Sequence, residues 1–283
     1  MTRHLTVRGA GIRVHETGDP ANPPILLLHG IGRSLEDWLP QHERLSDGWR
    51  VISVDLPGFG LSDRMPGPIT LAALADGVLA TVDALDERRP LHVMGNSLGG
   101  AVAMQLLVTA PARVATLTLV NSAGFGKEVA FFLRALAIPG LGLRLMRRMD
   151  ARAARRVERS LFVDRALVTQ ERVDFALQVA ARPGYAQVFL ETAQSLGGFR
   201  GIRRPWRDEL LAGAARHPRP TLLVWGDRDL ILPAAHLTAA QAAFPDARSH
   251  LFPDTGHMPQ IERADDFADL ARLFLSARSE HPA

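Results

Sequence analysis

The sequence predicts an α/β fold: a mostly parallel, eight-stranded sheet with helices on both faces and an inserted helical cap. Short apolar runs of strand length alternate with helix-length segments over residues 1–123. The alternation stops over residues 124–217 and resumes over residues 218–283. Alternating strands and helices form parallel sheets covered on both faces. We therefore expect a core made of residues 1–123 and 218–283, with residues 124–217 as a helical cap, or lid.

Each strand of this sheet corresponds to a short apolar run. Alternating apolar residues from Leu5 to Val14 surround a glycine-rich turn and predict a hairpin of two strands. The run from Ile25 to Leu28 is apolar on both faces, as is typical of a strand buried within a parallel sheet. Five further runs complete the eight strands: residues 50–55, 91–94, 114–120, 221–225 and 248–252.

The segments between these strands predict helices. In the core we expect helices over residues 71–85 and 98–109, the second ended by Pro111, and a final helix over residues 264–276. In the cap we expect several helices, broken at Pro139-Gly140, Pro183-Gly184 and Gly197-Gly198. Large apolar side chains of the cap are candidates either for its own core or for the lining of a pocket: Phe131, Phe132, Leu136, Phe162, Phe175 and Phe189.

The composition is that of a soluble globular protein, with 47% apolar and 22% charged residues. The formal net charge of +3 does not indicate a nucleic-acid binder, and we interpret the arginines between Arg134 and Arg207 as a solvated helix face. The absence of cysteine excludes disulfides and thiolate metal sites. No apolar run predicts a signal peptide or a membrane span, so we expect a cytoplasmic location.

The segment Gly95-Asn96-Ser97-Leu98-Gly99 joins a buried strand directly to a helix and fits the G-x-S-x-G pattern. The glycines permit the sharp turn that lifts a serine clear of the sheet. The start of the helix also favours negative charge that develops beside the serine. This context predicts that Ser97 is a nucleophile.

A serine nucleophile needs a base and a carboxylate that orients the base. His257 follows the last strand and begins the loop before the final helix, which makes it the best candidate for the base. Asp229 lies just beyond the preceding strand and is the candidate acid. Asp227 is a possible replacement, but we assign it to the turn.

Four segments resemble the α/β-hydrolase superfamily in the order that this family has them. Besides the serine turn, they are His29-Gly30-Ile31-Gly32, the segment from Asp55 to Asp63 that fits D-x-P-G-x-G-x-S, and the acid and base segments around Asp229 and His257. The resemblance covers nearly the whole chain. It implies a cap inserted after the sixth strand, and an oxyanion hole formed by the backbone N–H groups of Ile31 and Leu98.

The resemblance favours an esterase that works through an acyl-enzyme on Ser97, with no metal, no cofactor and a small-molecule ester as its partner. An alternative is a hydrolase of carbon–carbon bonds in ring-fission dienoates or related diketones. Asn96 is frequent before the nucleophile in those enzymes and is a candidate substrate-binding residue. Met258 and the pair Arg33-Ser34 depart from their pattern. A binding protein without activity is a third reading, because fold alone does not define function.

Overall fold

The computed structural model describes residues 1–147 and 149–279. Its main sheet has eight strands in the order β1-β2-β4-β3-β5-β6-β9-β10. The pairs β1–β2 and β2–β4 are antiparallel, and all the others are parallel. The predicted fold class is therefore confirmed. The strands are β1 Thr2–Val7, β2 Ala10–Thr17, β3 Pro24–Leu28, β4 Arg50–Val54, β5 Leu91–Asn96, β6 Val114–Val120, β9 Thr221–Gly226 and β10 Arg248–Phe252.

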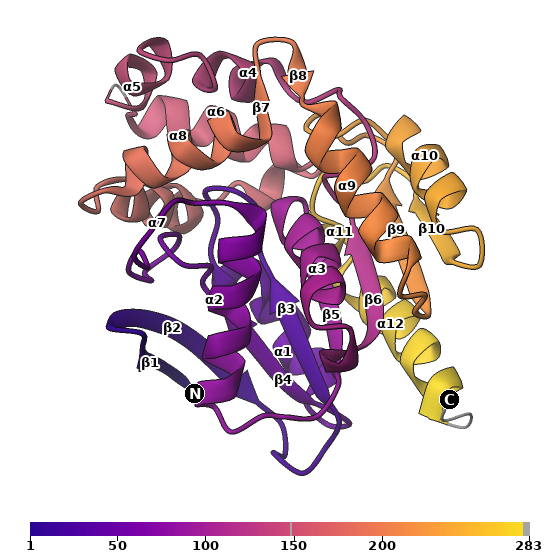
Figure 1. Ribbon diagram of the computed structural model, residues 1–283. Coiled ribbons are helices and arrows are strands. Elements are labelled where there is room, and N and C mark those ends of the chain that lie inside the picture. Colours follow the sequence, from indigo (N-terminus) through magenta and orange to yellow (C-terminus); the bar gives the residue numbers. More distant parts are fainter. Residues whose placement is uncertain (148, 280–283) are drawn as a thin grey trace.

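Both faces of the sheet are buried, because side chains alternate along each strand. In β3, Leu26 and Leu28 join the core beneath α2 and α3, whereas Ile25 and Leu27 join the core beneath α1 and α12. Figure 1 shows α2 and α3 in front of the sheet. The core helices are α1 Leu39–Leu45, α2 Leu71–Ala84, α3 Leu98–Thr109, α10 Ala235–Ala243, α11 Pro259–Glu262 and α12 Ala264–Ser279.

The segment between β6 and β9 is mostly helical and lies above the sheet in Figure 1. Its elements are α4 Phe131–Leu136, α5 Leu141–Met146, α6 Ala151–Leu161, α7 Gln170–Ala180, α8 Tyr185–Leu196, β7 Gly197–Gly198, β8 Gly201–Ile202 and α9 Arg204–Ala215. Three of the breaks between its helices lie at the predicted prolines and glycines, and two further breaks, after Met146 and after Leu161, were not predicted. The hairpin β7–β8, which we did not expect, joins two helices through a short turn.

The last helix of this segment differs from the rest because it packs beside the sheet. Helix α9 lies against α3, and Gly213 comes so close to Val108 that a Cβ atom would lie 2.7 Å from a Val108 methyl group. The division of the chain at residues 124 and 217 stays a prediction, and we use the word cap for residues 124–217 below.

The parallel strands bring separate parts of the sequence to one edge of the sheet. The carboxyl ends of β3, β5, β6 and β9 lie there because these strands pair in parallel, and open sheets of this type bind ligands at that edge. Within the described residues, no helix is both long and apolar enough to cross a bilayer.

Candidate active site

Ser97 occupies the sharp turn between β5 and α3. Its backbone has φ 56° and ψ −116°, a conformation that costs free energy for any residue with a side chain. The turn is possible because its neighbours lack side chains: a Cβ atom on Gly95 would lie 2.2 Å from the carbonyl oxygen of Gly99, and one on Gly99 would lie 2.2 Å from that of Leu28. The local sequence thus holds Ser97 above the sheet at the start of a helix.

His257 and Asp229 form a buried hydrogen-bonded pair. The Nδ1 atom of His257 lies 2.7 Å from Oδ2 of Asp229, and both side chains are almost fully buried. The other carboxylate oxygen, Oδ1, accepts hydrogen bonds from the backbone N–H groups of Ile231 at 2.7 Å and Leu232 at 3.0 Å. These contacts orient the carboxylate toward the imidazole and leave Nε2 of His257 available.

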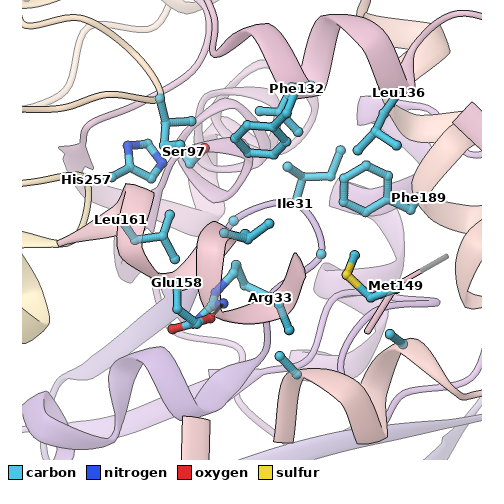
Figure 2. Close-up of a pocket in the computed structure, with 18 of the residues that line it drawn as sticks. Ile31, Arg33, Ser97, Phe132, Leu136, Met149, Glu158, Leu161, Phe189 and His257 are labelled. Carbon is cyan, nitrogen blue, oxygen red and sulfur yellow. Dashed lines mark hydrogen bonds and ion pairs between the residues drawn. The ribbon is translucent and has the colours of Figure 1, made fainter. Parts of the chain in front are cut away.

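Ser97 and His257 line the same cavity and lie next to each other in Figure 2. Within the described residues, no hydrogen bond joins the Ser97 hydroxyl to the imidazole. A nucleophile and its base often come within hydrogen-bonding distance only when substrate is bound. Asp227, the alternative acid, contacts the backbone N–H of Thr255 at 3.2 Å instead of the imidazole.

The two predicted oxyanion donors lie beside Ser97. Ile31, Ser97 and Leu98 line one apolar cavity. Within the described part of the chain, the backbone N–H groups of Ile31 and Leu98 donate no hydrogen bond to the protein. Two such donors beside a serine can stabilise a negatively charged oxygen.

His29 fixes the loop that carries Ile31. Its Nδ1 atom lies 2.7 Å from the carbonyl oxygen of Gly30, and its Nε2 atom accepts a hydrogen bond from the Leu56 backbone N–H at 2.9 Å. Because Nε2 is an acceptor, Nδ1 carries the proton and donates it. Burial lowers the pKa of His29 to about 4, so the ring stays neutral.

Buried histidines predict that the protein loses stability in mild acid. Burial lowers the pKa of His42 to about 3 and that of His29 to about 4, while in the unfolded chain histidines titrate near pH 6.5. Between about pH 6.5 and 4 the unfolded state therefore binds more protons, and the free energy of unfolding falls by about 1.4 kcal/mol per pH unit for each histidine. Urea unfolding from pH 7.5 to 5 measures the sum of these slopes, less the opposite contribution of Asp55, whose pKa burial raises to about 7.

His42→Gln is the matched variant, because it removes one of these titrating groups. His42 bonds to the hydroxyl groups of Ser53 at 2.7 Å and Thr17 at 2.8 Å, and glutamine can replace one of these contacts. The variant should be less stable at pH 7.5 and should show a slope smaller by about one proton. If the pH dependence of the free energy of unfolding were the same in this variant as in the wild type, His42 would not be one of the groups that cause the loss of stability in mild acid.

Asn96 braces the base. Its Nδ2 atom donates to the backbone carbonyl oxygens of His257 at 3.0 Å and Val120 at 3.3 Å, so the side chain ties the elbow to the loop that carries the imidazole. Its Oδ1 atom is buried, has no partner within the described residues, and lies close to Gly30. Asn96 also lines the cavity beside Ser97, and its predicted contact with substrate stays a prediction.

Two cavities meet at Ser97. We call the first, which reaches from His257 past Phe132 and Phe189 to Arg33, the inner cavity (Figure 2). We call the second, which lies under β7–β8 and touches Leu98 and Arg134, the hairpin cavity. Of the six apolar candidates in the cap, Phe132, Leu136 and Phe189 line the inner cavity, whereas Phe131, Phe162 and Phe175 line neither one.

The far end of the inner cavity holds a cluster of four charges. Arg33 forms ion pairs with Asp37 at 2.7 Å and with Glu158, and Arg172 contacts Glu158 at 2.9 Å and Asp37 at 3.1 Å. The two carboxylates are almost fully buried, and the cluster has no net charge. Arg33 and Asp37 belong to the core, whereas Glu158 and Arg172 belong to the cap. The cluster therefore joins the core to the cap beside the loop that carries Ile31.

Sequence analysis assigned no role to three polar residues of the site. Asn121, which follows β6 with φ 43°, donates from Nδ2 to Asp229 at 2.6 Å. Glu262 accepts from the backbone N–H groups of Gly256 at 2.6 Å and Val163 at 2.8 Å, and so ties the His257 loop to the cap. Asn121 could have been found from its place directly after a buried strand. The sequence held no such signal for Glu158, because this residue lies in an arginine-rich helix of the kind that is typical of a solvated surface.

Comparison with known proteins agrees with this architecture. A model of the alpha/beta hydrolase fold family matches residues 23–264. The chain is 35% identical over 270 residues to the dihydrolipoyllysine-residue acetyltransferase component of the acetoin cleaving system of Cupriavidus necator, covering 95% of this chain and 67% of that protein. It is 30% identical over 285 residues to 2-hydroxymuconate semialdehyde hydrolase of Pseudomonas sp. strain CF600, covering 97% and 93%.

Among solved structures, a meta-cleavage product hydrolase from Pseudomonas fluorescens IP01 superposes with a TM-score of 0.81 at 25% identity, and the match covers 97% of each chain. A parallel sheet with a serine elbow at its carboxyl edge defines a hydrolase of the α/β class. The chain belongs to the α/β-hydrolase family.

Proposed function

We propose that the protein hydrolyses uncharged carboxylic esters through an acyl-enzyme on Ser97. The observation that carries this proposal is the arrangement around Ser97, where two apolar cavities meet. Beside Ser97 lie the buried pair of Asp229 and His257 and the backbone N–H groups of Ile31 and Leu98, which donate no hydrogen bond within the described residues. Such an arrangement can hold the acyl and alcohol parts of an ester on either side of the nucleophile.

In the first half of the reaction, Nε2 of His257 takes the proton from Ser97 as Oγ bonds to the ester carbonyl carbon. Asp229 holds the imidazole through Nδ1 and stabilises its positive charge. The carbonyl oxygen becomes negative and accepts hydrogen bonds from Ile31 and Leu98. The tetrahedral intermediate then collapses, and the alcohol leaves with the proton from His257.

In the second half, His257 removes a proton from water, and the resulting hydroxide attacks the acyl carbon. Ser97 leaves as the proton returns to its oxygen, and the carboxylic acid is released. The cap, residues 124–217, supplies most of the apolar lining on the far side of Ser97, including Phe132, Leu136 and Phe189. We propose that this segment closes over the substrate as a lid.

Carbon–carbon bond hydrolysis is the second candidate, and two observations favour it. Asn96 precedes the nucleophile, and the chain is 31% identical to a 2-hydroxymuconate semialdehyde hydrolase of Pseudomonas putida over 94% of that protein. The charges of the cavities argue against it, because a dienoate carries a carboxylate. Arg33, the only arginine or lysine among the described residues of the inner cavity, already contacts two carboxylates. Arg134 lies over the rings of Phe131 and Phe199.

Turnover of p-nitrophenyl acetate, butyrate and octanoate, compared with that of a ring-fission dienoate, tests the proposal. We expect kcat/KM for the best ester to exceed that for the dienoate at least tenfold, because among the described residues Arg33 is paired with two carboxylates and Arg134 lies over two aromatic rings. Ser97→Ala serves as the blank and should turn over neither substrate. Preference for the dienoate would establish the second candidate, and activity that survives in Ser97→Ala would refute both.

A further inference from the structure

The outer surface of the cap exposes a group of large apolar side chains. Phe131 is 67% exposed and Phe199 is 53% exposed, and three leucines of α5 (Leu141, Leu143 and Leu145) are each about 40% exposed. These five account for nearly half of the eleven exposed large apolar side chains within the described residues. Scattered single residues of this kind are normal, but a group of them marks an interaction site.

The three elements that carry these five side chains adjoin one another. The rings of Phe131 and Phe199 are in edge contact, with centroids 6.3 Å apart. Nε of Arg134 donates to the carbonyl oxygen of Phe199 at 2.7 Å, which joins α4 to the β7–β8 hairpin. Helix α4 also packs against α5, and all three elements lie along the top of the molecule in Figure 1. We call this surface, formed by α4, α5 and the hairpin, the cap face.

Among the described residues, the charged side chains of α4, α5 and the hairpin are all arginines, and the acidic residues Glu128 and Asp150 border this surface. Residues 129–149 and 197–203 together contain six arginines and no acidic residue. Arg144, Arg147 and Arg200 are exposed. None of them takes part in the ion pairs formed by the described residues of the cap. The charge and the apolar side chains therefore occupy the same surface.

One of the two cavities at Ser97 adjoins this face. The hairpin cavity lies under Gly197, Gly198 and Gly201 and reaches Ser97. It shares Arg134 with a shallow bowl on the surface, which is also lined by Lys127, Arg200 and the exposed carboxylate of Glu128. A molecule in the hairpin cavity can thus have one end beside Ser97 and the other end at the cap face.

We propose that the cap face binds the surface of an anionic lipid bilayer. Peripheral membrane proteins bind through exposed apolar side chains that lie among arginines without ion-pair partners. The apolar side chains enter the headgroup region of the bilayer, and the arginines attract acidic lipids. Binding of a second copy through the same face is disfavoured, because a symmetric contact would bring arginines against arginines. Surface binding itself is independent of the proposed function, whereas delivery of lipid esters to Ser97 rests on it.

Co-sedimentation with vesicles tests this proposal. The full chain carrying Ser97→Ala, which leaves the lipids intact, is mixed with vesicles of phosphatidylcholine alone or with an equal share of phosphatidylglycerol. We expect binding to the anionic vesicles to be at least tenfold tighter. In the same background, Arg144→Gln with Arg147→Gln should weaken binding about 25-fold, since each arginine near an acidic surface contributes about fivefold. Phe131→Ser with Phe199→Ser should weaken it at least tenfold.

A matched control carries the same kinds of substitution far from the cap face: Leu273→Ser on α12 with Arg248→Gln on β10, both at exposed positions. This variant should bind as the parent does, and thermal unfolding checks that every variant is folded. Failure to bind anionic vesicles, or equal losses in the control, would overturn the proposal. So would a self-association that the phenylalanine substitutions abolish, because the face would then be an interface between copies. None of these outcomes depends on ester hydrolysis.

Discussion

Asp229→Asn should lower kcat about 10⁴-fold and leave KM nearly unchanged. The Oδ1 atom of residue 229 accepts two backbone N–H groups, from Ile231 and Leu232, so an asparagine keeps its oxygen on that side and turns Nδ2 toward His257. Nδ2 can only donate, and the imidazole must then accept at Nδ1. The proton of the neutral ring moves to Nε2, where it faces Ser97, and the ring can no longer act as a base.

Asn121 adds a cost in stability to the same substitution. Its Nδ2 already donates to Oδ2 of Asp229 at 2.6 Å, so an amide nitrogen at that place would face a second donor. Asp227→Asn is the control, because Asp227 lies on the same loop without contacting His257. It should keep kcat within about threefold of the wild type, as surface substitutions usually do little. Steady-state kinetics on the best ester distinguishes the two, and a larger loss in Asp227→Asn would reverse the assignment of the acid.

Glu158→Gln should lower the free energy of unfolding by about 3 kcal/mol. Glu158 is buried between Arg33 and Arg172, so its neutralisation leaves two guanidinium groups with one carboxylate, Asp37. Removal of one partner from a buried ion pair is costly because the remaining charge stays desolvated. For a chain of this length the melting temperature should fall by about 5 °C.

The same substitution should also raise KM, because Arg33 lies two residues after the proposed oxyanion donor Ile31 and the cluster joins this loop to the cap. Glu171→Gln is the matched control: Glu171 is exposed on α7 and belongs to no ion pair among the described residues. Its melting temperature should change by less than about 1 °C, as is usual for an exposed residue. A Glu158→Gln protein as stable as the control would show that the cluster does not hold the cap in place.

Most of the sheet could be predicted because its signals are local. The strand run at 114–120 and the helix at 98–109 have the predicted ends, and α2 and α12 differ from prediction by one and three residues. The β7–β8 hairpin escaped prediction because its strands are only two residues long, too short for any periodic pattern. The arginine-rich helix α6 was interpreted as solvated, yet Glu158 on this helix is buried through a pairing with a residue 125 positions away.

By itself, the sequence predicted the elbow, the order of the candidate nucleophile, acid and base, and the class of fold, since each follows from short motifs and from apolar runs of strand or helix length. Only the tertiary structure decided which carboxylate contacts His257, that Asn96 braces the loop of His257, and that Arg33, the one arginine among the described residues of the inner cavity, is neutralised. The physical reason is that these facts depend on contacts between residues far apart in the chain. Charge and burial at such contacts are set by the packing of the whole molecule, and local sequence patterns do not predict them.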